Sequence, residues 1–323
     1  MNVLWIFAHP EQRSLNGSLR DEGLRTLHAL GHDYRVSDLY AMGWNPVVGS
    51  ADFGRREHAP KASTNNPHTI KTTGNKKNTG PDDAHAPQPE RLLVGAASQR
   101  AYRSGMLSAD IRAEQEKLSW ADAVILQFPL WWYGMPAILK GWFDRVFVKG
   151  FAYGVSTPHD PTPAPGAAPA SGRRRTLRYG EGALAGKRAM VIVSAGAGEP
   201  SLGPRGINGD LCDLLFPLHH GTLWYTGMSV LPPLAVYDAD RVSPEAYEKA
   251  ATQLRERLGT LPTAAPLPFR HQNGTPDTRG DYDADLVLHP DVAPDEAGLT
   301  AHYHRDRAAS THESPLRRAI SEP

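Results

Sequence analysis

Three aromatic side chains stand together in the segment QFPLWWYGMP, where a soluble chain normally has a polar turn. Trp131, Trp132 and Tyr133 lie shortly after a proline and directly before a Gly-x-Pro turn. Gly, Asn, Asp and Ser usually occupy such positions because they satisfy turn geometry and bind water. Large rings there either pack beneath another segment or face a flat ligand. This segment by itself leaves both interpretations open.

Two further segments carry groups that suit phosphate and the polar edge of a ligand. In HPEQRSLNGS, His9, Ser14 and Asn16 surround the start of an expected helix, whose free N–H groups and dipole favour a phosphate. In SAGAGEPSLGPRGINGD, glycines would let backbone amides approach a ligand closely. A phosphate cradle, an aromatic platform and an amide-rich loop together describe a site for a flat, phosphorylated cofactor, which we interpret as a flavin.

Each of these segments also has a purely structural interpretation. His9-Pro10 can simply end a strand, Ser14 can simply cap a helix, and the glycines can form an ordinary turn. GAGEPS is a weak partial match to the dinucleotide-binding fingerprint, which should follow the first strand and not the fourth. The case for a cofactor site depends on the three segments meeting in space.

Strands and helices alternate along the chain in a pattern that would bring the three segments together. Short apolar runs are typical of strands buried on both faces, and helical spacing with capping residues marks the segments between them. This alternation predicts an α/β fold with a doubly wound five-stranded parallel sheet and helices on both faces. We expect strands at 2–8, 34–39, 122–129, 188–195 and, interrupted, 228–237, and helices at 14–30, 108–121, from Pro136 as first helical residue, and 243–258.

The three candidate segments follow the first, third and fourth of these strands. Ligands of an open parallel sheet bind outside the carboxyl ends of the strands, where the winding direction changes. We therefore expect one site at that edge, built from all three segments.

Whole-chain composition excludes several functional classes. The 323 residues include 35 basic and 35 acidic residues, so the charge balance favours neither nucleic acid nor an anionic membrane as a partner. No apolar run approaches the ~20 residues that cross a bilayer. The single cysteine, Cys212, fits a reducing compartment. We expect a soluble, cytoplasmic protein without membrane insertion, and no metal site, because His219 and His220 near Cys212 lack metal-ligand spacing.

Composition also divides the chain into a domain, two insertions and an extension. The segments at about 54–97 and 155–178 are rich in polar residues and proline, and contain too little apolar surface to offset their ordering entropy. We expect both to be loop insertions in a ligand-binding domain of residues 1–262. Residues 263–323 are expected to form a C-terminal extension that is partly ordered.

Several longer segments have the character of family signatures. They include AHPEQRSLNGSL, SDLYAMGWNPV, GPRGINGDL and the C-terminal LHPDVAPDEAGLTAHY. The most specific stretch runs from Leu107 to Tyr153 and contains ADAVILQFPLWWYGMPAILKGWFDRVFVKGFAY. On these segments the chain resembles the flavodoxin-fold NAD(P)H:quinone reductase family, over most of its length apart from the two insertions. The resemblance implies a flavodoxin-like fold.

The resemblance also implies an activity and an assembly. Members of the family are homodimers with one flavin per active site, usually FAD, with FMN as the alternative here. NADPH or NADH reduces the flavin, which then reduces a quinone or a related acceptor by two electrons. The two substrates use the same pocket in turn.

Individual residues receive roles from the same resemblance. The first segment would hold the phosphates and ribityl chain, the aromatic segment would line the isoalloxazine ring, and the glycine-rich segment would meet its polar edge. Tyr153 would reach from one subunit over the flavin of the other. The residues implied are His9, Ser14, Leu15 and Asn16 in the first segment, Pro129, Leu130, Trp131, Trp132 and Tyr133 in the second, and Ser194, Ala195, Gly196 and Ala197 in the third.

The chain departs from the family in the glycine-rich loop. Human-type members place a tyrosine and a histidine there, which help to stabilise charge on the reduced flavin, whereas the matching positions here hold Leu202 and Asn208. Neither residue is a proton donor of tunable pKa. Asn208 can still donate an amide hydrogen and is a candidate catalytic residue beside Tyr153, although we expect it to cap a helix from Gly209. Azo, nitro or enone compounds therefore join quinones as candidate acceptors.

A non-catalytic function is the alternative. Relatives of this fold serve as cytoplasmic ancillary subunits of potassium-efflux systems, in which flavin binding supports regulation of a membrane partner. Rapid oxidation of NADH or NADPH with a quinone would favour the enzyme over such a regulatory subunit.

Overall fold

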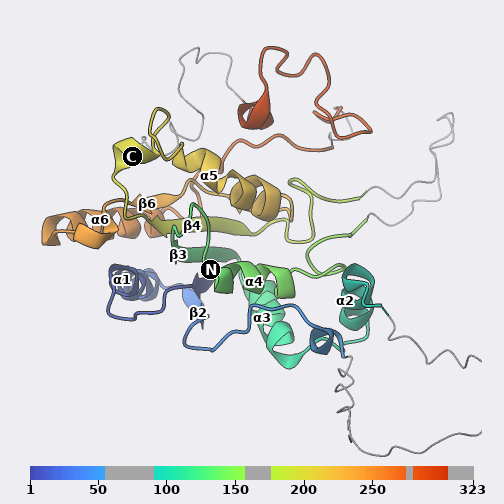
Figure 1. Ribbon diagram of the computed structural model, residues 1–323, viewed down its shortest axis with the longest axis horizontal. Coiled ribbons are helices and arrows are strands. Elements are labelled where there is room, and N and C mark those ends of the chain that lie inside the picture. Colours follow the sequence, from blue (N-terminus) through green and yellow to red (C-terminus); the bar gives the residue numbers. More distant parts are fainter. Residues whose placement is uncertain (55–90, 157–175, 274–278, 305–323) are drawn as a thin grey trace, which may run out of the picture.

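A parallel sheet forms the centre of the protein, in a computed structural model that describes residues 1–54, 91–156, 176–273 and 279–304 (Figure 1). The strand order is β2-β1-β3-β4-β5, and the short β6 also pairs with β4. Every pairing between these strands is parallel. The strands are β1 (Asn2–Phe7), β2 (Asp33–Asp38), β3 (Ala123–Pro129), β4 (Arg188–Ser194), β5 (Ser229–Val230) and β6 (Leu234–Val236).

The predicted fifth strand is interrupted, as expected. β5 pairs with the beginning of β4 and β6 with its end. Pro232 and Pro233 lie between the two pieces. Since proline has no N–H to donate to a ladder, the break follows from the sequence.

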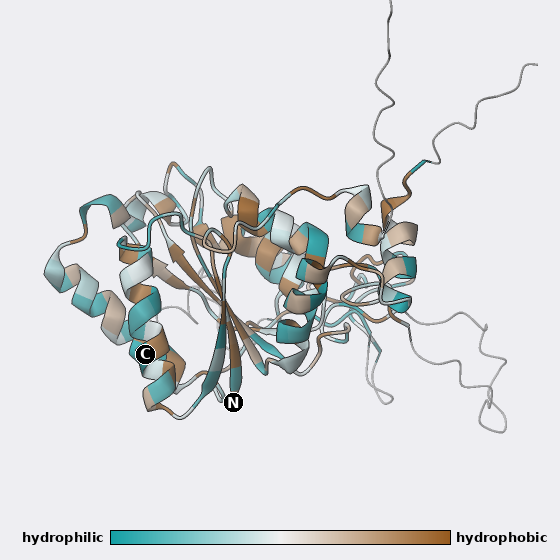
Figure 2. Cartoon of the chain, turned by 90° about the horizontal axis from the view of Figure 1, so that it is seen from below, coloured by the Kyte–Doolittle hydropathy of each residue, from teal (hydrophilic) through white to brown (hydrophobic). Residues whose placement is uncertain are grey.

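Helices cover both faces of the sheet, so the predicted doubly wound fold is confirmed. α1 (Leu15–Ala29) and α6 (Pro244–Gly259) pack on one face, in a core cluster that includes Leu19 and Leu254. The opposite face is covered by α2 (Val94–Arg103), α3 (Ala109–Trp120), α4 (Ala137–Val146) and α5 (Leu211–Leu218). Figure 2 shows hydrophobic residues concentrated in the strands and on the helix faces turned toward them.

Local sequence signals predict where the helices begin, and the prediction is wrong by one residue for α4. Ser14 and Ser243 cap α1 and α6, accepting hydrogen bonds from Gly17 N and Ala246 N. Pro136, which we expected as the first helical residue, is instead the N-cap of α4, with an extended backbone (ψ 147°). The bond from Lys140 N to the carbonyl of Pro136 accounts for the one-residue shift.

The first predicted insertion ends earlier than expected. Residues 55–90 lie outside the described part of the chain, but α2 begins at Val94, within the predicted loop. The prediction of a loop from composition was wrong here because α2 packs against the core through small residues. Ala97 and Ala101, one helical turn apart, are buried in the core without any large apolar side chain between them. Most of the second insertion, 157–175, also lies outside the described residues.

Part of the predicted C-terminal extension packs against the domain. Phe269 and Tyr303 are buried and form a β-bridge. Arg270 holds the returning segment, because its Nε donates to the carbonyl of Ala301 at 2.8 Å and its backbone N to the carbonyl of His302 at 3.0 Å. Residues 274–278 and 305–323 lie outside the described part of the chain.

A fully buried histidine follows α5. His219 opens a π-helical turn (His219–Trp224), and among the described residues neither of its ring nitrogens has a hydrogen-bond partner. Burial lowers the pKa of His219 to about 3, because the charged imidazolium would lose its hydration. The folded protein therefore keeps this side chain neutral under all ordinary conditions.

The stability of the protein should fall as the pH decreases below about 6.5, where the unfolded chain protonates His219 and the folded protein does not. The folded-state pKa lies below the unfolded one, so the stabilisation is present at neutral pH and is lost on acidification. This site alone should cost about 2 kcal/mol of unfolding free energy between pH 7.5 and 5. Urea unfolding at several pH values, on wild type and on His219→Gln, measures how steeply the unfolding free energy of each protein depends on pH.

The exposed His28 on α1 offers a matched control. His28→Gln should keep the wild-type pH slope, whereas His219→Gln should flatten it. Equal slopes for all three proteins would contradict the assignment of a neutral, buried His219.

Candidate functional site

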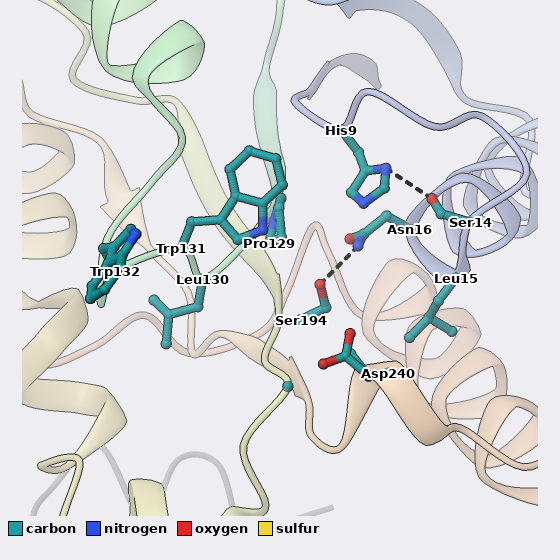
Figure 3. A pocket seen from close by; sticks show the side chains of 12 residues that line it. His9, Ser14, Leu15, Asn16, Pro129, Leu130, Trp131, Trp132, Ser194 and Asp240 are labelled. Carbon is teal, nitrogen blue, oxygen red and sulfur yellow. Dashed lines mark hydrogen bonds between the residues drawn. The ribbon is translucent and has the colours of Figure 1, made fainter.

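A cavity of ≈ 410 Å³ opens at the carboxyl edge of the sheet (Figure 3). All three candidate segments contribute to it, after β1, β3 and β4. The predicted meeting of these segments is therefore confirmed. The lining residues are His9, Ser14, Leu15, Asn16, Pro129, Leu130, Trp131, Trp132, Ser194, Gly196, Ala239 and Asp240.

One end of the cavity is the N-terminus of α1. Ser14 Oγ accepts from Gly17 N at 3.2 Å and donates to the carbonyl of Glu11 at 2.6 Å, while His9 Nδ1 lies 3.0 Å from the same hydroxyl. Leu15 and Asn16 are the first two helical residues, so their N–H groups have no carbonyl one turn earlier in the helix to bond. The helix terminus offers an anion these N–H groups and the positive end of the helix dipole.

Asn16 is a buried polar residue of the cavity wall. Its Nδ2 donates to Ser194 Oγ at 2.8 Å, and its backbone carbonyl accepts from Gln127 Nε2 at 2.7 Å. Its Oδ1 has no hydrogen-bond partner among the described residues, although the side chain is only 4% exposed. Since an unpaired buried acceptor is costly, this oxygen is suited to accept a hydrogen bond from a hydroxyl group of a ligand.

The aromatic segment forms a tight turn and is not core. Trp131 and Gly134 exchange two backbone hydrogen bonds of 3.1 Å, and the two residues between them have left-handed backbones, with φ 49° at Trp132 and φ 60° at Tyr133. Trp132 is 95% exposed, and its neighbours Trp131 and Tyr133 are 44% and 49% exposed. The interpretation of these rings as buried core is therefore wrong.

The glycine-rich segment lies opposite a second loop that sequence reasoning missed. A Cβ added at Gly196 would lie 2.6 Å from Asp240 Oδ2, so the Asp240 side chain approaches the backbone of the glycine-rich segment closely. Asp240 and Ala239 line the cavity from a 3-10 turn (Ala239–Arg241) just after β6. The rule that ligands lie beyond the carboxyl ends of strands applies to this strand as well.

Asn208 does not cap a helix, which corrects our expectation. Asp210 caps α5, its side chain accepting from Cys212 N at 2.9 Å. Gly209, with φ +84°, turns the chain between Asn208 and the helix. The side chain of Asn208 instead accepts a hydrogen bond from Tyr133 Oη at 3.1 Å, next to the aromatic turn.

Five predicted residues lie outside the cavity lining of a single chain. Tyr133 directly follows the lining residue Trp132, and Asn208 is hydrogen-bonded to Tyr133. Ala195 and Ala197 follow Ser194 but pack toward the core. Tyr153 is half-buried away from the cavity, where burial raises its pKa above the ordinary value for tyrosine. A role for Tyr153 over a flavin would require a second subunit.

The described residues contain neither a candidate metal site nor a candidate membrane span. No group of three or more His, Cys, Asp or Glu side chains there could hold a metal ion. Within the same residues, no helix is long and apolar enough to span a membrane.

Comparison with known proteins agrees with the geometry. The family described as "Flavodoxin-like fold" matches residues 1–259. A crystal structure from Klebsiella pneumoniae, assigned as a quinone reductase, superposes with a TM-score of 0.76 at 43% identity, covering 94% of this chain and 100% of that one.

Two curated relatives carry enzyme names. "Ribosyldihydronicotinamide dehydrogenase-like protein traD" of Penicillium crustosum is 40% identical, over 84% of this chain and 85% of its own. "NAD(P)H dehydrogenase [quinone] 1" of Rattus norvegicus is 32% identical, over 83% and 80%. The resemblance drawn from the sequence is confirmed: this chain belongs to the flavodoxin-fold NAD(P)H:quinone reductase family.

Proposed function

We propose that this protein is a flavin-dependent oxidoreductase that takes electrons from NAD(P)H and reduces quinones or related acceptors by two electrons, the two substrates using one pocket in turn. The cavity carries the proposal, because an anion-binding helix terminus, an unpaired buried Asn16 Oδ1 and an exposed aromatic turn meet there. The enzyme names of the relatives support it. The alternative of a regulatory efflux subunit draws no support from these names.

The residues present fit a flavin. The N-terminus of α1, with His9, Ser14 and Leu15, would hold the phosphates, and Asn16 would accept from the ribityl chain. Pro129, Leu130 and the aromatic turn would line the ring. The bound flavin supplies the hydride chemistry, and the protein supplies its position.

Backbone amides would meet the polar edge of the ring. Ala195 N donates to the carbonyl of Val236 at 2.9 Å, so this N–H is already committed to the sheet. We assign the contact to the N–H groups of Gly196 and Ala197, with Ser194 Oγ nearby in the wall. Donors placed in advance in this way stabilise negative charge on a ligand without having to reorganise.

Asp240 favours FAD over FMN. Its carboxylate lines the same cavity as the phosphate-binding helix terminus. The terminal phosphate of FMN carries nearly two negative charges, which a nearby carboxylate repels, whereas each phosphate of FAD carries one and is followed by ribose hydroxyls that a carboxylate can bind.

The open side of the cavity is where a second subunit belongs. Trp132 is almost fully exposed in the single chain, so none of the described residues covers its outer face. We propose a homodimer in which Tyr153 of each subunit closes the other subunit's site. Asn208, at the rim, is the candidate polar contact for the acceptor.

Purified protein should carry a noncovalent flavin, with FAD the major species on mass spectrometry of the released cofactor. It should then oxidise NADH or NADPH when a quinone is added. Ribosyldihydronicotinamide belongs in the same assay because a relative is named for it. A colourless protein that takes up neither FAD nor FMN on titration would refute the proposed function.

Trp132→Ala should weaken flavin binding without destabilising the apoprotein. Loss of the ring contact should cost about 1 kcal/mol of binding free energy, or about five-fold in Kd. The unfolding free energy should change by no more than about 0.5 kcal/mol, because the side chain is exposed. Met42→Ala, which removes another exposed apolar side chain away from the cavity, should change neither quantity.

The dimer and the role of Tyr153 can be tested together. Sedimentation equilibrium should give a dimer, and Trp132→Ala and Tyr153→Ala homodimers should both have reduced activity. A heterodimer of the two variants should recover about half of the wild-type activity, because both lesions then fall in one site and the other is intact. A heterodimer no more active than the two homodimers would place Tyr153 in its own subunit's site.

A further inference from the structure

The aromatic turn has an unusual backbone for its residues. A two-residue turn with positive φ at both positions is normally made of Asn and Gly, because a Cβ raises the energy of the left-handed region. Here the two positions are Trp132 and Tyr133. Backbones of this kind persist only where surrounding contacts hold them. The exposed Trp132 ring supplies few such contacts.

One side-chain hydrogen bond connects this turn to the opposite loop. Tyr133 Oη donates to Asn208 Oδ1 at 3.1 Å, joining the segment after β3 to the segment after β4, seventy-five residues later. Figure 3 shows that Trp131 and Trp132, on the same turn, stand on one side of the site, with Ser194 and Asp240 on another.

The acceptor end of this bond is itself held in place. Asn208 N donates to the carbonyl of Ser201 at 3.0 Å, and Asn208 Nδ2 donates to Ser201 Oγ at 3.2 Å. Ser201 in turn donates to the carbonyl of Gly198, from Oγ at 2.8 Å and from N at 3.1 Å. Asn208 Oδ1 is therefore a fixed point on the glycine-rich loop.

We propose that the Tyr133–Asn208 hydrogen bond is a latch that fixes the aromatic turn in its left-handed form and thereby positions the Trp132 wall beside the cofactor and acceptor. The phenol of Tyr133 is thus a positioning residue, acting through its neighbour Trp132. The proposal rests on the flavin-reductase function above, and it gives Asn208 a structural partner in addition to its proposed contact with the acceptor.

The latch has a distinct signature in the protein without cofactor. Gly134 N donates to the carbonyl of Trp131 only while the turn is closed. Removing the latch should raise the opening equilibrium about five-fold, the effect of one net hydrogen bond. Amide exchange of Gly134, followed by NMR on the apoprotein, should accelerate by that factor in Tyr133→Phe and in Asn208→Ala.

The affinity for flavin should also change when the latch is lost and the aromatic turn opens. Each single variant should raise the flavin Kd by up to about five-fold, the limit for a turn that is mostly open without cofactor. The double variant should raise it by the same factor as either single variant and not by the product of the two, because only one bond is lost. For a given acceptor, KM should rise more than kcat falls, since the latch positions a wall and contributes no reacting group. Tyr34→Phe, which removes a half-exposed hydroxyl on β2, should leave all of these values unchanged.

The outcomes separate the latch from the proposed function. Unchanged Gly134 exchange in both single variants would overturn the latch, whether or not the protein binds flavin. Additive effects of the two variants on flavin Kd would also overturn it, because independent losses would then explain them. A wild-type protein that binds no flavin would refute the oxidoreductase function, while faster exchange in the same variants would still support the latch.

Discussion

The buried hydrogen bonds around Asn16 join the sheet to the helix that begins the site. Trp5 Nε1 donates to Gln127 Oε1 at 3.0 Å, Gln127 donates to the carbonyl of Asn16, and Asn16 donates to Ser194. β1, β3, β4 and α1 are thus connected by polar groups whose loss would leave partners unpaired in the interior. This constraint sets where the N-terminus of α1 lies relative to the other two loops.

Around that fixed end the site becomes more exposed with distance from the sheet. Ser194 and Gly196 lie against the strands and Asp240, whereas the aromatic turn projects into solvent. In the proposed function, such a site would hold phosphate with buried groups and place a flat ring beside exposed ones. The proposed latch between Tyr133 and Asn208 and the proposed second subunit would then hold the exposed groups in position at the open side.

Most of the fold could be predicted from the sequence because its signals are local. Apolar runs marked the strands, Ser14 and Ser243 marked helix starts, and Pro232 and Pro233 marked the break in the last strand. The prediction failed where small residues carry the packing, as in α2, whose buried alanines resemble a polar loop in composition. The predicted start of α4 at Pro136 was wrong by one residue because a proline can occupy the N-cap as well as the first helical position.

By itself, the sequence determined which segments meet at the carboxyl edge, since parallel strands bring their carboxyl ends together whatever the loops contain. Only the tertiary structure decided what each side chain does there. Asn208 contacts Tyr133 and not a helix N-terminus because the left-handed Gly209 turns the chain between Asn208 and α5. Asp240 lies close to Gly196 because two loops distant in sequence meet at the carboxyl edge of the sheet. Such contacts depend on the path of the chain through space, which no local pattern of residues records.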